Sequence, residues 1–319
     1  MFGLAEGQAA PAATSVGGFA EQTLPRQGVS SGWDTHLMAL RSPSFLDLET
    51  LLSQAEYHDI DVPKSQEIVE TTVSKRSGGG KAGIGALALN GSAGSDFQYQ
   101  STYSLQPREK ATVSKVIDEL IRQKAVQVNP VGDSALSRDV LVEIEGTARI
   151  TAVSVLSKVF FVFRRLMLAR DINDLNELAN LDLEDADVAE EIQRVYLRNE
   201  LLPLPLLLEV SGSSLPHKVY VNVRPDFFID EASADRVEGD LRVLGSVSKL
   251  VLDGEYRVTD EWLLHGWEFM MRRIMMAQIQ DDLEEVTQQL ERLGLNLPDD
   301  DVHAYISGPA IVIDAIALY

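Results

Sequence analysis

The chain has 319 residues, a hydrophobic fraction of 45%, a formal charge of −21 and no cysteine. This length and hydrophobic content allow a large buried core and two domains. The lack of cysteine excludes disulfides, thiolate metal sites and cysteine nucleophiles and is typical of cytosolic proteins, while the acidic charge opposes binding to nucleic-acid phosphates.

The first 42 residues are rich in small and polar side chains and show no apolar periodicity, so we expect them to form a flexible arm. They contain no basic stretch followed by an apolar run, so the sequence predicts a cytoplasmic protein without a secretory signal. Ordered structure is expected to begin near Ser44, which can cap the start of a helix. Asp47, three residues later, takes the place of the glutamate of a capping box. Leu48 and Ala55 belong to the apolar stripe of that helix.

A small α+β unit is predicted for residues 43–130. Alternation of apolar and polar residues predicts strands at 66–74 and 97–105, on either side of a glycine-rich insertion at 77–96. Apolar residues at helical spacing predict a helix that begins near Pro107, and a short strand follows at 125–128.

A larger α+β domain is predicted for residues 131–319. It contains a buried helix at 154–170, an acidic helix at 187–199 and one long helix from about Asp260 to Leu293. Strands are expected at 139–144, 206–210, 218–223, 241–252 and 310–319. The fold class is therefore α+β, with mixed, mainly antiparallel strands and several helices that include the long C-terminal one.

The glycine-rich insertion resembles a phosphate-binding loop only in part. A residue other than glycine, Lys75, stands where the first glycine is needed, and Ala82 replaces the Ser or Thr that would hold magnesium. The pattern favours a mobile insertion between two strands, and nucleotide binding, membrane contact and packing against another chain are the alternatives. The small and apolar residues around the single charge of Lys81 are the reason to keep a contact segment among them. Its candidate residues are Gly78, Gly79, Gly80, Lys81, Gly83, Ile84, Gly85 and Leu87.

Acidic runs at 182–187, 281–285 and 299–301 could hold a divalent cation, but none has the spacing of a calcium loop, and we expect no metal or other cofactor. No set of residues for nucleophilic catalysis is recognisable, so the catalytic and cofactor-binding residues stay unknown. The predicted long helix also carries methionines, whose flexible side chains suit an adaptable partner groove. The candidate residues of this groove are Trp267, Met270, Met271 and Met275.

The order of these features resembles an uncharacterised family of bacterial proteins that is known only as a domain of unknown function. The resemblance covers about residues 43–319 and implies no activity or ligand. It rests on Phe45-Leu46-Asp47 with Leu51 and Gln54, the Tyr99–Leu105 strand before the Ser114–Ile121 helix, Val243–Val247, and Gly308–Tyr319.

The sequence favours a non-enzymatic interaction or assembly protein that binds a protein partner or itself. One alternative is a metal- or nucleotide-dependent enzyme that uses carboxylates from distant segments. The other alternative is a membrane-contacting protein that acts through the glycine-rich insertion. Nucleic acid is an unfavourable partner because of the acidic charge.

Overall fold

The computed structural model describes most of the chain from residue 41 onward. The described residues are 41–61, 107–132, 136–170, 202, 204–229, 237–279, 283, 287–288, 292 and 304–319. The predicted strands at 66–74 and 97–105 and the predicted helix at 187–199 lie outside them.

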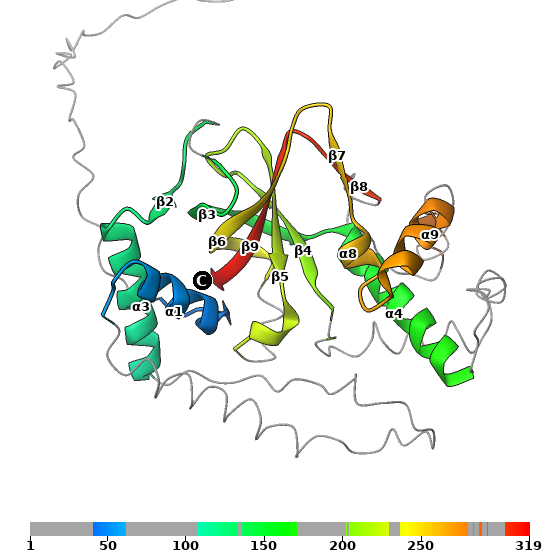
Figure 1. Ribbon diagram of the computed structural model, residues 1–319, viewed down its shortest axis with the longest axis horizontal. Helices are drawn as coiled ribbons and strands as arrows, with labels where there is room; N and C mark the ends of the chain where they lie inside the picture. Colours follow the sequence, from blue (N-terminus) through cyan, green and yellow to red (C-terminus); the bar gives the residue numbers. More distant parts are fainter. Residues whose placement is uncertain are drawn as a thin grey trace, which may run out of the picture. The chain divides into compact units, whose positions relative to one another are not determined.

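Five strands close into a barrel (Figure 1). Around the barrel, each strand pairs with the next and the last pairs with the first; all pairs are antiparallel except β5 with β9. The strands, in their order around the barrel, are β3 (Leu141–Ile150), β4 (Leu206–Ser211), β5 (Lys218–Val223), β9 (Ala310–Leu318) and β6 (Gly239–Val251).

The connectivity of the barrel follows from this order. If the five barrel strands are numbered one to five along the chain, their spatial order around the barrel is one, two, three, five, four. Strands three and five, which are neighbours in the barrel, are parallel. This is the connectivity of a five-stranded Greek-key barrel of the OB type, in which the second and third strands form the face that usually binds ligands. Here those strands are β4 and β5.

The barrel interior is filled by aliphatic side chains from all five strands. On β5, for example, Val219, Val221 and Val223 point inward, as the two-residue period of a strand requires. Tyr220 lies between them and points outward, yet it is fully buried, because another layer of the chain covers it.

Two helical layers flank the barrel (Figure 1). The first contains α1 (Leu48–Tyr57) and α3 (Pro107–Arg122), which share an apolar cluster with the outer surface of β9. Asp47, rather than Ser44, caps α1, because its carboxylate accepts a hydrogen bond from the Thr50 N–H at 3.1 Å. Two short strands extend the sheet on this side: β1 (Phe45–Leu46) pairs with β9, and β2 (Val126–Val128) pairs with β3.

The second layer contains α4 (Ala152–Arg170), α8 (Asp260–Leu263) and α9 (Phe269–Ile279). A two-stranded ribbon of β7 (Tyr256–Val258) and β8 (Tyr305–Ser307) joins this layer to the ends of β6 and β9. A short 3-10 helix, η3 (Pro225–Phe227), follows β5. None of the described helices is long and apolar enough to cross a membrane.

The prediction of one long C-terminal helix is wrong. Helix α8 ends at Leu263, and a turn through Gly266, whose φ is +82°, separates it from α9. Positive φ is unfavourable for side chains other than glycine and is incompatible with a continuous helix. Glu268 then begins the second helix, because its carboxylate accepts hydrogen bonds from the N–H groups of Met270 and Met271 at 2.8 and 3.1 Å.

Two glycines allow the barrel strands to approach each other closely. A Cβ atom at Gly245 on β6 would lie 2.5 Å from the carbonyl oxygen of Asp314 on β9. A Cβ atom at Gly146 on β3 would lie 2.5 Å from the carbonyl oxygen of Ser211 on β4. Both separations are shorter than van der Waals contact, so no other residue fits at either position without a shift of the strands.

Candidate functional site

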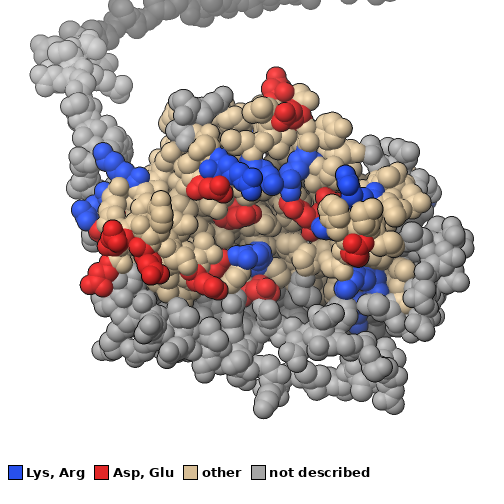
Figure 2. All heavy atoms as spheres, in the orientation of Figure 1, with Lys and Arg blue, Asp and Glu red and all other residues tan. Residues whose placement is uncertain are grey.

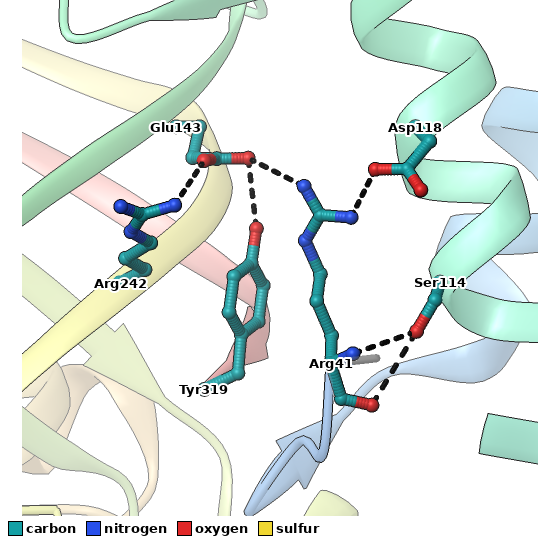
Figure 3. A network of polar contacts seen from close by, with 6 residues as sticks. All are labelled: Arg41, Ser114, Asp118, Glu143, Arg242 and Tyr319. Carbon is teal, nitrogen blue, oxygen red and sulfur yellow. Dashed lines mark hydrogen bonds and ion pairs between the residues drawn. The ribbon is translucent and has the colours of Figure 1, made fainter. Parts of the chain in front are cut away.

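A buried carboxylate on the outer surface of the barrel organises a polar network of six residues (Figure 3). The side chain of Glu143, on β3, is only 5% exposed. Its Oε2 accepts a hydrogen bond of 2.8 Å from the Tyr319 hydroxyl and lies 4.0 Å from Nη2 of Arg41. Its Oε1 lies 3.9 Å from Nη1 of Arg242, on β6.

Arg41 connects this carboxylate to α3. Its backbone N–H donates a hydrogen bond of 2.9 Å to the Ser114 hydroxyl, and its guanidinium pairs with Asp118. The guanidinium also lies over the ring of Tyr319, 5.3 Å from the centroid. Burial lowers the pKa of Arg41, but the hydrogen bond to Asp118 and the nearby charges outweigh it and raise the pKa overall, so the side chain stays charged.

The chemistry of this network is that of a structural anchor. A general base needs a lone pair that can reach the proton of a substrate. The Glu143 carboxylate instead faces two guanidinium groups and a phenol that donates to it. The network thus joins the residue-41 segment, α3, β3, β6 and the residue that follows β9.

Replacing Tyr319 with phenylalanine is expected to reduce the loss of stability at high pH. Burial, followed by the Glu143 carboxylate, raises the folded-state pKa of Tyr319 above 10.0, although Arg41 acts in the opposite direction. A raised folded-state pKa gives stability that is present below about pH 10 and is lost as the pH rises further. Urea unfolding at about pH 8 and about pH 10.5 measures this loss. Equal losses in wild type and Tyr319→Phe would contradict the expectation.

The β4–β5 face of the barrel is covered by the second helical layer. Trp262 of α8 is buried in one apolar cluster with Leu207 of β4 and Tyr220 of β5. Its indole N–H donates a hydrogen bond of 2.9 Å to Oδ1 of Asn222, whose amide donates at 2.9 Å to Asp314 on β9. The face that binds ligands in many OB-type barrels is therefore occupied here by the chain itself.

The residues of the predicted partner groove divide between two sides of α9. Met275 is buried, and Trp267 is half-buried against the same apolar cluster, which α4, α8 and α9 share. Met271 is half-buried, and Met270 is exposed. Met275 thus lies in the interior, and Trp267 packs against the same cluster with part of its side chain exposed.

The outer side of α9 carries an apolar face, of which the predicted partner groove includes only Met270. Phe269, Met270 and Ile274 are 54%, 56% and 42% exposed, respectively. At 100° per residue, these three side chains span about 140° of the helix circumference, with Arg273 among them. The Arg273 guanidinium lies over the Phe269 ring at 5.6 Å, and it has no carboxylate partner among the described residues. We call these four residues the outer face of α9.

The other predicted sites lie outside the described residues. This applies to the glycine-rich contact segment from Gly78 to Leu87 and to the acidic runs at 182–187 and 299–301, and to all four carboxylates of the run at 281–285. Within the described ranges, no group of three or more His, Cys, Asp or Glu side chains is placed to hold a metal ion.

Charge is distributed unevenly over the chain. The described residues contain 20 Lys and Arg and 21 Asp and Glu, so nearly all of the formal charge of −21 belongs to the remaining residues. Figure 2 shows Lys and Arg side chains in a band across the barrel, with Asp and Glu side chains beside it. The surface of the described part is therefore not an acidic one.

A family model described as "Domain of unknown function (DUF6414)" matches residues 47–319, which confirms the resemblance to a domain of unknown function. No curated protein and no solved structure matches the chain.

Proposed function

The chain belongs to the family described as a domain of unknown function (DUF6414), and since this description names no activity, we propose a function from the geometry: a non-enzymatic protein that binds a protein partner through the outer face of α9. The proposal includes a cytoplasmic location in a bacterium, which the absence of cysteine supports. The partner is another protein or a second copy of the chain.

The observation that carries this proposal is the exposure of Phe269, Met270 and Ile274 on one helix face. The opposite side of the same helix packs in the interior through Met275, and Met276, at the edge of the outer face, belongs to the same apolar cluster, so the helix already has its own contact with the fold. Contiguous exposed apolar side chains of this kind mark interaction surfaces, and methionine adapts well to a partner. The polar network around Glu143, by contrast, is satisfied by its own members.

Size-exclusion chromatography with light scattering tests the proposal on the full chain, alone and with proteins captured from native lysate. Met270→Glu and Ile274→Glu place charges on the outer face of α9 and are expected to abolish a defined assembly. Tyr57→Glu is the matched control, because Tyr57 is a large side chain on α1 and is 81% exposed. A chain that is strictly monomeric and captures nothing, or an assembly that all three variants keep, would exclude this function.

The two alternatives, a carboxylate-dependent enzyme and a membrane-contacting protein, depend on residues outside the described ranges. They stay predictions.

A further inference from the structure

The sulfur atoms of this chain all belong to methionine side chains, because the chain has seven methionines and no cysteine. The described methionines differ sharply in exposure. On α9, Met270 is 56% exposed, whereas Met275 and Met276 are 3% and 7% exposed. Met271 of α9 and Met167 of α4 are half-buried. An oxidant dissolved in water therefore reaches the side chain of Met270 more easily than those of the other methionines of α9.

The reaction that this exposure permits is the oxidation of a thioether to a sulfoxide by a peroxide. A lone pair of the sulfur atom forms a bond to one oxygen of hydrogen peroxide, the O–O bond breaks, and proton transfer releases the other oxygen as water. The sulfur atom loses the two electrons that the peroxide gains. The product has a polar S–O group in place of an apolar thioether, and methionine sulfoxide reductases reverse the step.

The position of Met270 on the helix determines what such a change does to the surface. Around the circumference of α9, Met270 lies between Phe269 and Ile274, so an S–O group there divides the apolar outer face. Helical side chains lean towards the N-terminus, and the Arg273 guanidinium accordingly lies over the Phe269 ring at 5.6 Å, in the turn that also contains Met270. A guanidinium donates hydrogen bonds, so the sulfoxide oxygen has a donor on its own helix.

The same change leaves the interior of the fold intact. The apolar cluster that α9 shares with α4 and α8 contains Met275 and Met276, but it does not contain Met270. A sulfoxide within this cluster would place a polar group among apolar side chains, and burial protects those two methionines from it. Oxidation at Met270 changes only the surface that a partner would contact.

We propose that Met270 is a redox-sensitive modification site: a peroxide oxidises its thioether to the sulfoxide, and the change releases the protein partner from the outer face of α9. The release of the partner rests on the function proposed above, whereas the selective oxidation depends only on the exposure of the side chain. Reduction of the sulfoxide restores the apolar face and the binding of the partner.

Mass spectrometry of the full chain treated with hydrogen peroxide tests the selectivity. We expect Met270 to be oxidised at least about tenfold faster than Met275, in line with their exposed fractions of 56% and 3%. The matched control is the chain unfolded in urea, in which all four methionines of α9 should be oxidised at similar rates. Equal rates for Met270, Met275 and Met276 in the folded chain would overturn the proposal.

The effect on the partner is tested by size-exclusion chromatography with light scattering. Peroxide treatment is expected to abolish the assembly of the wild type, and sulfoxide reductases for both epimers, with dithiothreitol, should restore it. Met270→Leu keeps the apolar face but has no thioether at this position, so its assembly should survive the same treatment. If treated Met270→Leu loses its assembly as the wild type does, another residue is responsible and the proposal is wrong.

Thermal melts separate regulation from damage. The melting temperature of the oxidised wild type should change by less than about 2 °C, as expected for a change confined to the surface of a chain of this size. A larger fall that accompanies the loss of assembly would mean that the fold itself is damaged, and this would contradict the release of a partner from an intact face.

The proposed function and this inference fail separately. If Met270→Glu abolishes assembly, but the wild type keeps its assembly after Met270 has been oxidised, only the inference fails. If assembly is absent or independent of α9, the proposed function fails and the release of a partner fails with it. The oxidation rates of the folded chain still decide in that case whether Met270 is the modification site.

Discussion

Replacing Glu143 with alanine is expected to lower the free energy of unfolding by about 1–3 kcal/mol, the usual cost of leaving a buried hydrogen-bond donor without its acceptor. The substitution would remove the acceptor of the Tyr319 hydroxyl and one of the two carboxylates near the guanidinium of Arg41, which is 14% exposed and would keep its pairing with Asp118. Urea unfolding near neutral pH, followed by circular dichroism, measures the change.

Glu145→Ala is the matched control, because Glu145 lies two residues away on the same strand and pairs with Arg242 at 3.0 Å, but its side chain is 56% exposed. We expect this control to change stability by less than about 1 kcal/mol. Acetate added at high concentration should restore part of the stability of Glu143→Ala by filling the vacated carboxylate position. A similar loss in both variants would show that the network is not an anchor.

Replacing Trp262 with alanine is expected to cost about 3–5 kcal/mol, because a fully buried indole is removed from between α8 and the barrel. The space would be lined by Leu207 and Tyr220, which the strands hold in place. Urea unfolding monitored by far-ultraviolet circular dichroism gives the change, since the variant lacks the main buried indole as a fluorescence probe.

Trp262→Phe separates packing from hydrogen bonding. It keeps most of the apolar contact but leaves Oδ1 of Asn222 without the indole donor, so we expect a smaller loss, near 1 kcal/mol from the hydrogen bond. If Trp262→Ala were as stable as wild type, α8 would not be a fixed cover of the β4–β5 face.

Periodicity along the sequence predicted many individual elements. The sequence predicted strands at 218–223 and 310–319, and the structure confirms them as β5 and β9. The apolar helix at 154–170 is confirmed as α4, whose N-terminal half is mostly buried. The barrel itself could not be predicted, because its closure depends on the pairing of β5 with β9, and no local pattern specifies which distant strands meet.

The prediction of one long C-terminal helix was wrong for a different reason. The methionine-rich stretch is apolar on both sides, so its pattern looked continuous across Gly266. Only the positive φ of that glycine and the capping by Glu268 divide it. The same pattern hid the difference between the two sides of α9, since the sequence shows methionines at 270 and 275 but not which one faces the interior.

The polar network around Glu143 also could not be predicted from the sequence. On β3, Glu143 and Glu145 alternate with inward-facing residues and appear equivalent, yet their side chains are 5% and 56% exposed. The difference arises because Arg41 and Tyr319 lie over one of them and not over the other. Arg41 also falls within residues 1–42, where we expected a flexible arm.

Glycines in the segments that carried the family resemblance occupy close contacts. Gly245 lies in Val243–Val247, where β6 meets β9. Gly308 begins the segment that leads into β9, and a Cβ atom there would lie 1.9 Å from the carbonyl oxygen of Leu252. At both positions a nearby carbonyl oxygen leaves no room for a Cβ atom, so the fold itself requires glycine in these two segments of the family resemblance.

The pairing of β5 with β9 has a consequence for the order of folding. β5 ends at Val223 and β9 begins at Ala310, so this contact closes a loop of more than 80 residues. Contacts between residues so far apart in sequence form slowly, and on the ribosome the barrel cannot close before residue 318 has left the exit tunnel. Until then β5 and β6 have unpaired edges, which can join other chains. We therefore expect the newly made protein to depend on chaperones during synthesis more than its final barrel would suggest.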